Sequence, residues 1–201
     1  MKHIILATAL LFTSTLTAQS TYTEEVAAAQ EKLNEQYRDS AYSPLDSADF
    51  ATFTEHEFFP IDSTFCVTAR IKRTPFSKPF MMTTTKGAPR EYRKWGEAHF
   101  TINGEKHVLN LYQSTSLKKK SGYADYLFLP FRDATNSVDS YGGGRFLNLR
   151  IPEKGKKITI DFNLAYNPYC AYSARYSCPV TPEENTLPIR IEAGIKGPTT
   201  H

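Results

Sequence analysis

From Phe65 onward, apolar and polar residues alternate, and this period of two constrains the fold more than any other feature of the chain. Such alternation is typical of half-buried strands. No helical repeat separates the strand-like segments, which disfavours parallel βαβ units and favours an antiparallel sheet. The predicted strands cover residues 65–72, 80–85, 91–102, 108–113, 126–131, 146–151, 157–162 and 187–191.

The fold class expected is mainly β, a β-rich α+β domain. A sheet of this size curls or folds over to bury one face, so we expect an antiparallel barrel-like or sandwich domain. The 13 Phe and 12 Tyr residues suit such strands. Asn103-Gly104 predicts a hairpin, and a two-residue turn there would place His99 and His107 on opposite faces of the sheet.

An amphipathic helix is predicted before the sheet. Tyr22, Val26, Ala29, Leu33 and Tyr37 recur every three or four residues and form one stripe. We expect Val26, Ala29 and Leu33 to be buried, with the helix packed outside the β-domain or across one of its open ends.

The first residues have the layout of a secretory signal peptide. Lys2 precedes an apolar run over residues 4–12, and small residues follow, so that cleavage after Ala18 or Ser20 is expected. The run is too short to span a bilayer, and no later stretch is apolar enough for a membrane anchor. We therefore expect an exported protein, periplasmic or extracellular.

The predicted organisation has a single folded domain after the signal. The segments expected are a signal peptide at 1–18, an N-terminal helical segment at 19–57, a β-rich domain at 58–195 and a disordered tail at 196–201.

Charge and motif content exclude several functions. Removal of Lys2 lowers the formal charge from +3 to +2, which is too little to indicate nucleic-acid binding. The chain contains no G-x-S-x-G, P-loop, H-E-x-x-H or C-x-x-C motif. We predict no cofactor and no metal site.

Two polar segments interrupt the apolar pattern, and the first is residues 130–149. Its glycine run, Gly142 to Gly144, can expose backbone amides to an anion, and the adjacent Arg145 can bind a carboxylate or phosphate. In the alternative interpretation, the run is a hairpin connection and Arg145 pairs with Asp133 to support the structure. Both interpretations stay open.

The second polar segment, residues 161–188, is a long aromatic loop. Asp161 and Asn163 point away from the apolar face of the preceding strand, and Asn167-Pro168 marks a turn. Loops of this length are uncommon unless they are functional or held in place. We expect Arg145 to lie within salt-bridge distance of Asp133 or Asp161.

Several sequence blocks in these segments resemble one bacterial family of unknown function, the domain-of-unknown-function family 1684. The blocks are FRDAT, YGGGRFL, DFNLAYNPYCAY, YSCP and NTLPIRIEAG. The resemblance implies a β-rich domain and no known activity. The residues that we expect to bind a ligand fall on these blocks: Asp133, Tyr141, Gly142, Gly143, Gly144, Arg145, Asp161, Asn163, Tyr166, Asn167, Tyr172 and Asn185.

Cys170 and Cys178 lie eight positions apart in the second segment. In an oxidising compartment, two nearby cysteines are usually bonded, so we expect a Cys170–Cys178 disulfide. Free thiols, a metal site and a catalytic cysteine are the alternatives, and family members without export signals favour free thiols. Cys66 has no partner in any of these versions.

The favoured functional hypothesis is a module that binds a small polar or anionic ligand between the 131–145 and 161–187 loops. One alternative is a structural or interaction domain of the cell envelope. The other is a hydrolase in which Asp133 or Asp161 serves as general acid or base and Arg145 stabilises negative charge.

The signal peptide gives a direct prediction. The protein purified from its native cells should begin at residue 19 or residue 21 when its N-terminus is sequenced. A native protein that begins at Met1 would contradict export through this segment.

Overall fold

The computed structural model describes the backbone of residues 4–198 and the side chains of residues 21–198. The helices are α1 (Ile4–Arg38) and α2 (Ser47–Thr52). The strands are β1 (Cys66–Arg73), β2 (Pro79–Met82), β3 (Arg90–Ile102), β4 (Glu105–Ser114), β5 (Tyr126–Phe131), β6 (Arg145–Arg150) and β7 (Lys157–Asp161).

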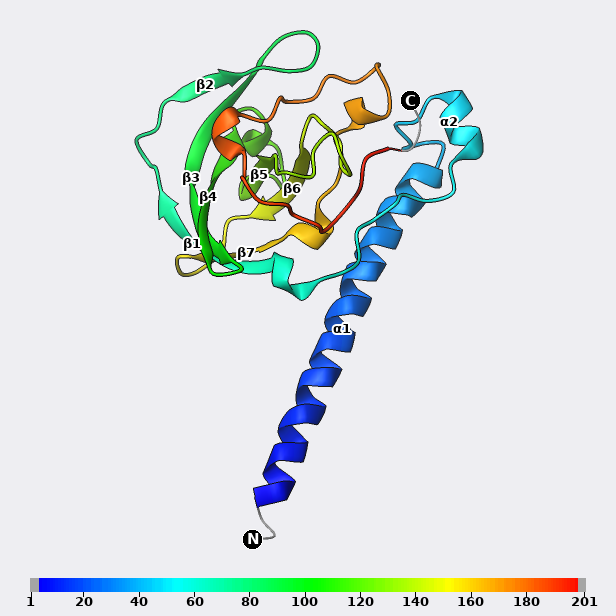
Figure 1. The fold of residues 1–201 in the computed structure, drawn as a ribbon. Coiled ribbons are helices and arrows are strands. Elements are labelled where there is room, and N and C mark those ends of the chain that lie inside the picture. Colours follow the sequence, from blue (N-terminus) through cyan, green and yellow to red (C-terminus); the bar gives the residue numbers. More distant parts are fainter. Residues whose placement is uncertain (1–3, 199–201) are drawn as a thin grey trace.

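The strands form one antiparallel sheet, as the alternation predicts. Their order is β6-β5-β4-β3-β1-β7, and β2 pairs with β3 outside this path. The sheet curls into a half-barrel, and the C-terminal segment crosses its open side (Figure 1). The expected fold class, a curled antiparallel sheet with an N-terminal helix, is therefore confirmed.

The Asn103-Gly104 turn has the geometry that the sequence predicts. Both residues have positive φ, 50° and 82°, which a two-residue hairpin turn requires and which glycine adopts without steric cost. The register pairs His99 with Val108 and Phe100 with His107. The two histidines therefore lie on opposite faces of the sheet.

The main core fills the concave face of the sheet. Alternate residues of β1, Val67, Ala69 and Ile71, point into it, and the C-terminal segment adds Leu187, Ile191 and Ala193. Burial of this apolar surface is the main favourable contribution to folding.

The eighth strand predicted at 187–191 is wrong. This segment is irregular and is joined to residues 132–134 by only two backbone hydrogen bonds, Leu187 to Arg132 and Ala134 to Ile189. A continuous ladder is not possible here, because Pro188 has no N–H to donate.

Helix α1 contacts the domain through a more polar face than the stripe predicts. Val26 and Tyr37 are buried, but Leu33 is only half-buried and Ala29 is exposed, so the expectation for these two residues is wrong. The helix packs against loops rather than against the sheet, and those loops present backbone groups that need hydrogen-bond partners. Gln30 accordingly donates to the Asn163 carbonyl at 3.1 Å.

The ends of the chain bear on two further predictions. Helix α1 includes most of the predicted signal peptide, whose residues 1–3 and whose side chains lie outside the described part, so its removal stays a prediction. No helix within residues 4–198 is long and apolar enough to cross a membrane. In the predicted tail, Lys196 and Gly197 donate backbone hydrogen bonds to Glu57 and Asp139, and residues 199–201 lie outside the described part.

A second core cluster joins α1 to the C-terminal segment. Tyr37, Tyr172 and Ile195 belong to it, and His56 packs against them with its ring centroid 4.3 Å from that of Tyr37. His56 is 8% exposed, and its Nε2 atom has no hydrogen-bond partner in the described part of the chain. Burial, aided by the nearby Arg38, lowers the pKa of His56 to about 4.

This lowered pKa predicts an acid-sensitive fold. Between the ordinary His pKa of about 6.5 and the folded value of about 4, the unfolded chain binds a proton that the folded chain does not, so stability falls as the pH is lowered through this window. Replacing His56 with Phe should reduce the loss of unfolding free energy between about pH 7.5 and about pH 4.5 by about 2 to 3 kcal/mol. Urea denaturation at both pH values measures this loss in the wild type and in the variant. An equal loss in the two proteins would contradict the burial of a neutral His56.

Candidate functional site

Arg145 and Asp133, two of the predicted ligand-binding residues, form a buried ion pair. Arg145 Nη2 lies 2.7 Å from Asp133 Oδ2, and both side chains are 0% exposed, which confirms the predicted contact. The guanidinium also donates to the carbonyls of Ile191, Ala193 and Ile195. Four of its hydrogen bonds therefore link β6 to Asp133 and to the C-terminal segment. The ion pair is thus part of the hydrogen-bond network of the protein interior.

The two predicted carboxylates have separate partners. Asp133 accepts from the backbone N–H groups of Thr135 and Ile191, while Asp161 accepts from the Tyr22 hydroxyl at 3.0 Å and from Asn163. No interaction joins the two carboxylates in the described part of the chain. The geometry therefore offers no support to a hydrolase that uses both.

The glycine run forms a tight turn in which the Gly144 amide is used within the protein. Gly144 has a φ of +94° and donates its N–H to the Tyr141 carbonyl, so this amide is not available to a ligand. A Cβ atom at Gly144 would lie 2.7 Å from the Phe131 carbonyl oxygen, and one at Gly143 would lie 2.4 Å from the Tyr141 ring. The run is glycine because neighbouring groups leave no room for a side chain.

Three asparagine amides that we expected to bind a ligand instead fix the long loop. Asn163, Asn167 and Asn185 are 0% exposed. Asn163 bonds both backbone groups of Asp62, and Asn167 donates to the Lys196 carbonyl and to the Tyr172 hydroxyl.

Asn185 closes a gap in the sheet. Strands β4 and β5 are paired at a single position, Tyr112 with Phe128, and separate beyond it. The Asn185 amide accepts from the Asn110 N–H at 2.9 Å and donates to the carbonyls of Asn110 and Pro130 at 3.0 and 2.7 Å. It thus replaces the backbone partner that a paired strand would have supplied.

A groove beside these buried residues is the candidate functional site. It has a volume of about 430 Å³ and lies between α1, the ends of β3, β5 and β6, and the long loop. Of the predicted ligand-binding residues, only Tyr166 lines it. The other lining residues are Leu33, Gln36, Arg90, Tyr92, Leu117, Tyr126, Phe128, Phe146, Asn148, Pro168, Tyr169, Cys178 and Pro179.

A continuous row of rings forms one wall of this aromatic groove. Tyr92 contacts Phe128 at 5.6 Å between centroids, Phe128 contacts Phe146 at 4.8 Å, and Phe146 contacts Tyr166 at 6.1 Å. Sequence reasoning missed the row, although a signal exists. Residues 126–131, YLFLPF, are apolar at every position, as expected of a strand with both faces covered.

The main polar group in the aromatic groove is Asn148. Its Oδ1 accepts from the hydroxyls of Tyr126 and Tyr166 at 2.6 and 2.7 Å. Burial and nearby Tyr92 raise the pKa of Tyr126 to about 12, which keeps that hydroxyl protonated and able to donate. The two tyrosines thus fix the orientation of the Asn148 amide, and its N–H groups have no protein acceptor within residues 4–198.

Arg90 is the charged residue that lines the aromatic groove. Its Nη2 donates to the Ser177 carbonyl, and no carboxylate lies within salt-bridge distance of it in the described part of the chain. At the α1 wall, Gln36 donates to the Tyr169 hydroxyl at 2.6 Å. The groove therefore offers aromatic rings, the side-chain amides of Asn148 and Gln36, and the Arg90 cation.

The predicted Cys170–Cys178 disulfide is not formed in this structure, in which all three cysteines are free thiols. The two side chains nevertheless contact each other, and the Cys170 N–H donates to Cys178 Sγ at 3.3 Å. Cys178 lowers the pKa of Cys170 to about 6 by hydrogen bonding, with smaller contributions from Thr85 and Tyr141. Among the described residues, no group of three or more His, Cys, Asp or Glu side chains could hold a metal ion.

Comparison with known proteins supports the family resemblance. A sequence profile described as "Protein of unknown function (DUF1684)" matches residues 51–196. No curated protein matches the chain. The solution NMR structure of the uncharacterized protein from gene locus rrnAC0354 of Haloarcula marismortui is similar, with a TM-score of 0.69 and 27% identity over 92% of this chain and 99% of that chain.

The buried ion pair predicts a large and non-additive effect of mutation. Replacing Arg145 with Met should lower the free energy of unfolding by about 3 to 5 kcal/mol, because Asp133 is left as an unpaired buried charge. The double variant Arg145→Met/Asp133→Leu should recover part of the loss. Urea denaturation measures both. The control Arg190→Met, which removes a surface guanidinium paired with Asp139 and Glu192, should change stability little. An equal effect of Arg145→Met and Arg190→Met would contradict the role of the pair.

Proposed function

Since the chain belongs to the DUF1684 family, whose description gives no function, we propose from the geometry of the site that the aromatic groove binds a small ligand. The ligand has a planar ring and a polar or anionic substituent. The observation that carries this proposal is the Asn148 amide, which two tyrosine hydroxyls orient while its N–H groups lack a protein acceptor.

The lining of the groove supports a ligand of this kind. Binding sites for small molecules are mostly apolar and aromatic, with a few polar groups that fix orientation, and their volumes are about 300 to 1,000 Å³. The groove, with a volume of about 430 Å³ and six aromatic side chains, matches this description. A planar ring would pack against Phe128 and Phe146, the Asn148 N–H groups would bond an acceptor atom, and Arg90 would favour an anionic substituent.

Binding is favoured over acid–base catalysis because of the residue types present. The residues that line the groove include no Asp, Glu or His within the described part of the chain. General acid–base chemistry near neutral pH depends mostly on those side chains. The groove contains a cysteine, Cys178, but its partner Cys170 and not a histidine lies beside it.

Export is part of the proposal, and the layout of residues 1–18 supports it. In an oxidising compartment, Cys170 and Cys178 would lose two protons and two electrons to form a disulfide, the oxidant being supplied by that compartment. The hydrogen bond from the Cys170 backbone N–H to Cys178 Sγ supports this pairing. The bond would fix Cys178 and therefore one wall of the aromatic groove.

A structural or interaction role in the cell envelope is the second candidate. The burial of Asp133, Arg145, Asn163, Asn167 and Asn185, with their hydrogen bonds inside the domain, favours it. These residues explain how the loops are held. They do not explain why Tyr126, Tyr166 and Asn148 are arranged beside an open groove.

A thermal-shift panel tests the binding function. Planar aromatic carboxylates and the corresponding neutral amides, beginning with 4-hydroxybenzoate and 4-hydroxybenzamide, should raise the Tm, the acids more than the amides. Asn148→Leu should abolish the shift, and Tyr166→Phe should weaken binding about tenfold through loss of one oriented hydrogen bond. Arg90→Gln should remove the preference for acids.

The matched control is Tyr123→Phe, which removes a tyrosine hydroxyl outside the groove and should bind as the wild type does. The proposal fails if no member of the panel binds, or if Asn148→Leu retains wild-type affinity.

A further inference from the structure

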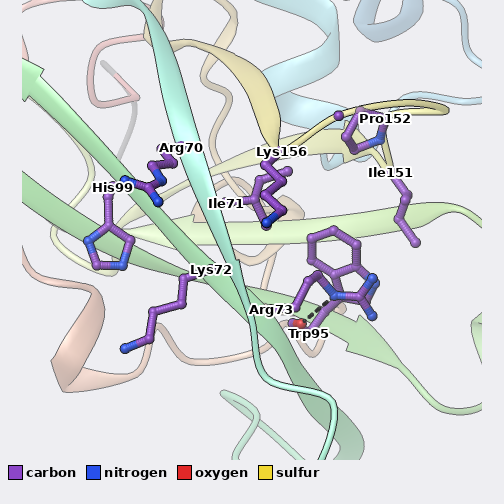
Figure 2. Close-up of a pocket in the computed structure, with 10 residues that line it drawn as sticks. Arg70, Ile71, Lys72, Arg73, Trp95, His99, Ile151, Pro152 and Lys156 are labelled. Carbon is purple, nitrogen blue, oxygen red and sulfur yellow. Dashed lines mark hydrogen bonds between the residues drawn. The ribbon is translucent and has the colours of Figure 1, made fainter.

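A second concavity, larger than the aromatic groove and sharing no lining residue with it, lies around the end of β1. Its volume is about 600 Å³. We call it the cationic cleft, lined by Arg70, Lys72, Arg73, His99 and Lys156 around Ile71 and Trp95. Figure 2 shows Arg70, Lys72 and His99 on one side of β1 and Arg73, Trp95 and Lys156 on the other.

The sheet register places basic residues side by side at this cleft. Arg70 of β1 lies opposite Lys157 of β7 on one side and opposite His99 of β3 on the other. Like charges directly opposite each other across an antiparallel pair destabilise the sheet. Arg70 forms no ion pair in the described part of the chain, so no carboxylate offsets its repulsion with Lys157.

The acidic residues near the cleft do not neutralise it. Glu97 contacts Lys94 at 2.8 Å, His99 at 3.1 Å and Lys72 at 3.5 Å, and these contacts, chiefly that with Lys94, lower its pKa to about 2. One carboxylate thus pairs with three basic side chains. Glu153, in the loop between β6 and β7, does not line the cleft.

Arg73 is held in a fixed orientation within the cleft. Its guanidinium carbon lies 3.9 Å from the centroid of the Trp95 ring, and its Nε donates to the Trp95 carbonyl at 3.2 Å (Figure 2). The two Nη groups have no protein acceptor within residues 4–198. A guanidinium held in this way can donate two parallel hydrogen bonds to a phosphate with little further loss of entropy.

We propose that the cationic cleft binds a small ligand with at least two phosphate groups. One phosphate is held by Arg73 and Lys156, and another by Arg70 and Lys72 on the other side of β1. Several cations with one shared carboxylate favour a multiply charged anion over a monocarboxylate. A phosphate bound at Arg70 would also offset the repulsion between Arg70 and Lys157, which lies outside the cleft.

Calorimetric titration with inorganic phosphates tests the proposal. At about 50 mM salt, tripolyphosphate should bind at least about tenfold more tightly than orthophosphate, and added NaCl should weaken its binding. Arg73→Gln and Arg70→Gln should each weaken tripolyphosphate binding at least about tenfold.

The Arg70→Gln variant has a second readout. Without ligand, its Tm should equal or exceed that of the wild type, because a repulsive pair is lost. A binding defect in this variant therefore cannot be attributed to misfolding.

Two controls distinguish specific binding at the cleft from non-specific electrostatic attraction to basic residues elsewhere. Lys118→Gln removes one charge from the basic run at 118–120, and Asn148→Leu alters only the aromatic groove; both should bind tripolyphosphate as the wild type does. The proposal is overturned if tripolyphosphate does not bind the wild type, if orthophosphate binds equally well, or if Lys118→Gln weakens binding as much as Arg70→Gln does.

Discussion

The Arg145 guanidinium, buried against Asp133, is the interaction on which the rest of the structure depends. The C-terminal segment crosses the open side of the sheet without forming a strand, so its backbone carbonyls lack ladder partners. A buried carbonyl without a partner costs free energy comparable to a lost hydrogen bond. Arg145 supplies donors to the carbonyls of Ile191, Ala193 and Ile195 at once, and Asp133 compensates its charge while accepting from the Ile191 N–H.

The same physical problem explains the buried amides. Asn185 bridges the separated strands β4 and β5, and Asn163 joins the long loop to Asp62 and, through its carbonyl, to Gln30 of α1. The polar residues of the sequence blocks are therefore mostly internal hydrogen-bond partners. Once they fix the loop, Tyr166 and Cys178 stand at the edge of the sheet beside Phe146 and Asn148. The aromatic groove is thus a consequence of how the irregular segment is held.

Sequence reasoning predicted the fold well because its main determinants are local. The alternation in β1 and the Asn103-Gly104 turn each fix a face or a register within a few residues. The eighth strand was wrong because Pro188 could not complete a ladder, and a side-chain hydrogen bond from Arg145 to the Ile191 carbonyl holds this segment instead.

The candidate site was harder to predict than the fold. The contact between Arg145 and Asp133 could be predicted, since opposite charges flanked one loop, but its full burial depended on a segment nearly 50 residues away. The aromatic groove combines residues from α1, three strands and a loop, so no local pattern defines it. The cationic cleft depends on which strands are neighbours, because only the pairing of β1 with β7 places Lys157 opposite Arg70.

Hydrogen–deuterium exchange at the backbone amide of Ile191 tests the central claim most directly. This N–H lies outside any strand and donates to Asp133 Oδ1. If the buried ion pair fixes the C-terminal segment, the amide should exchange as slowly as the core amides of β4, through global unfolding. Exchange at the rate of an exposed loop would show that the segment opens independently, and would contradict an account in which Arg145 and Asp133 hold it in place.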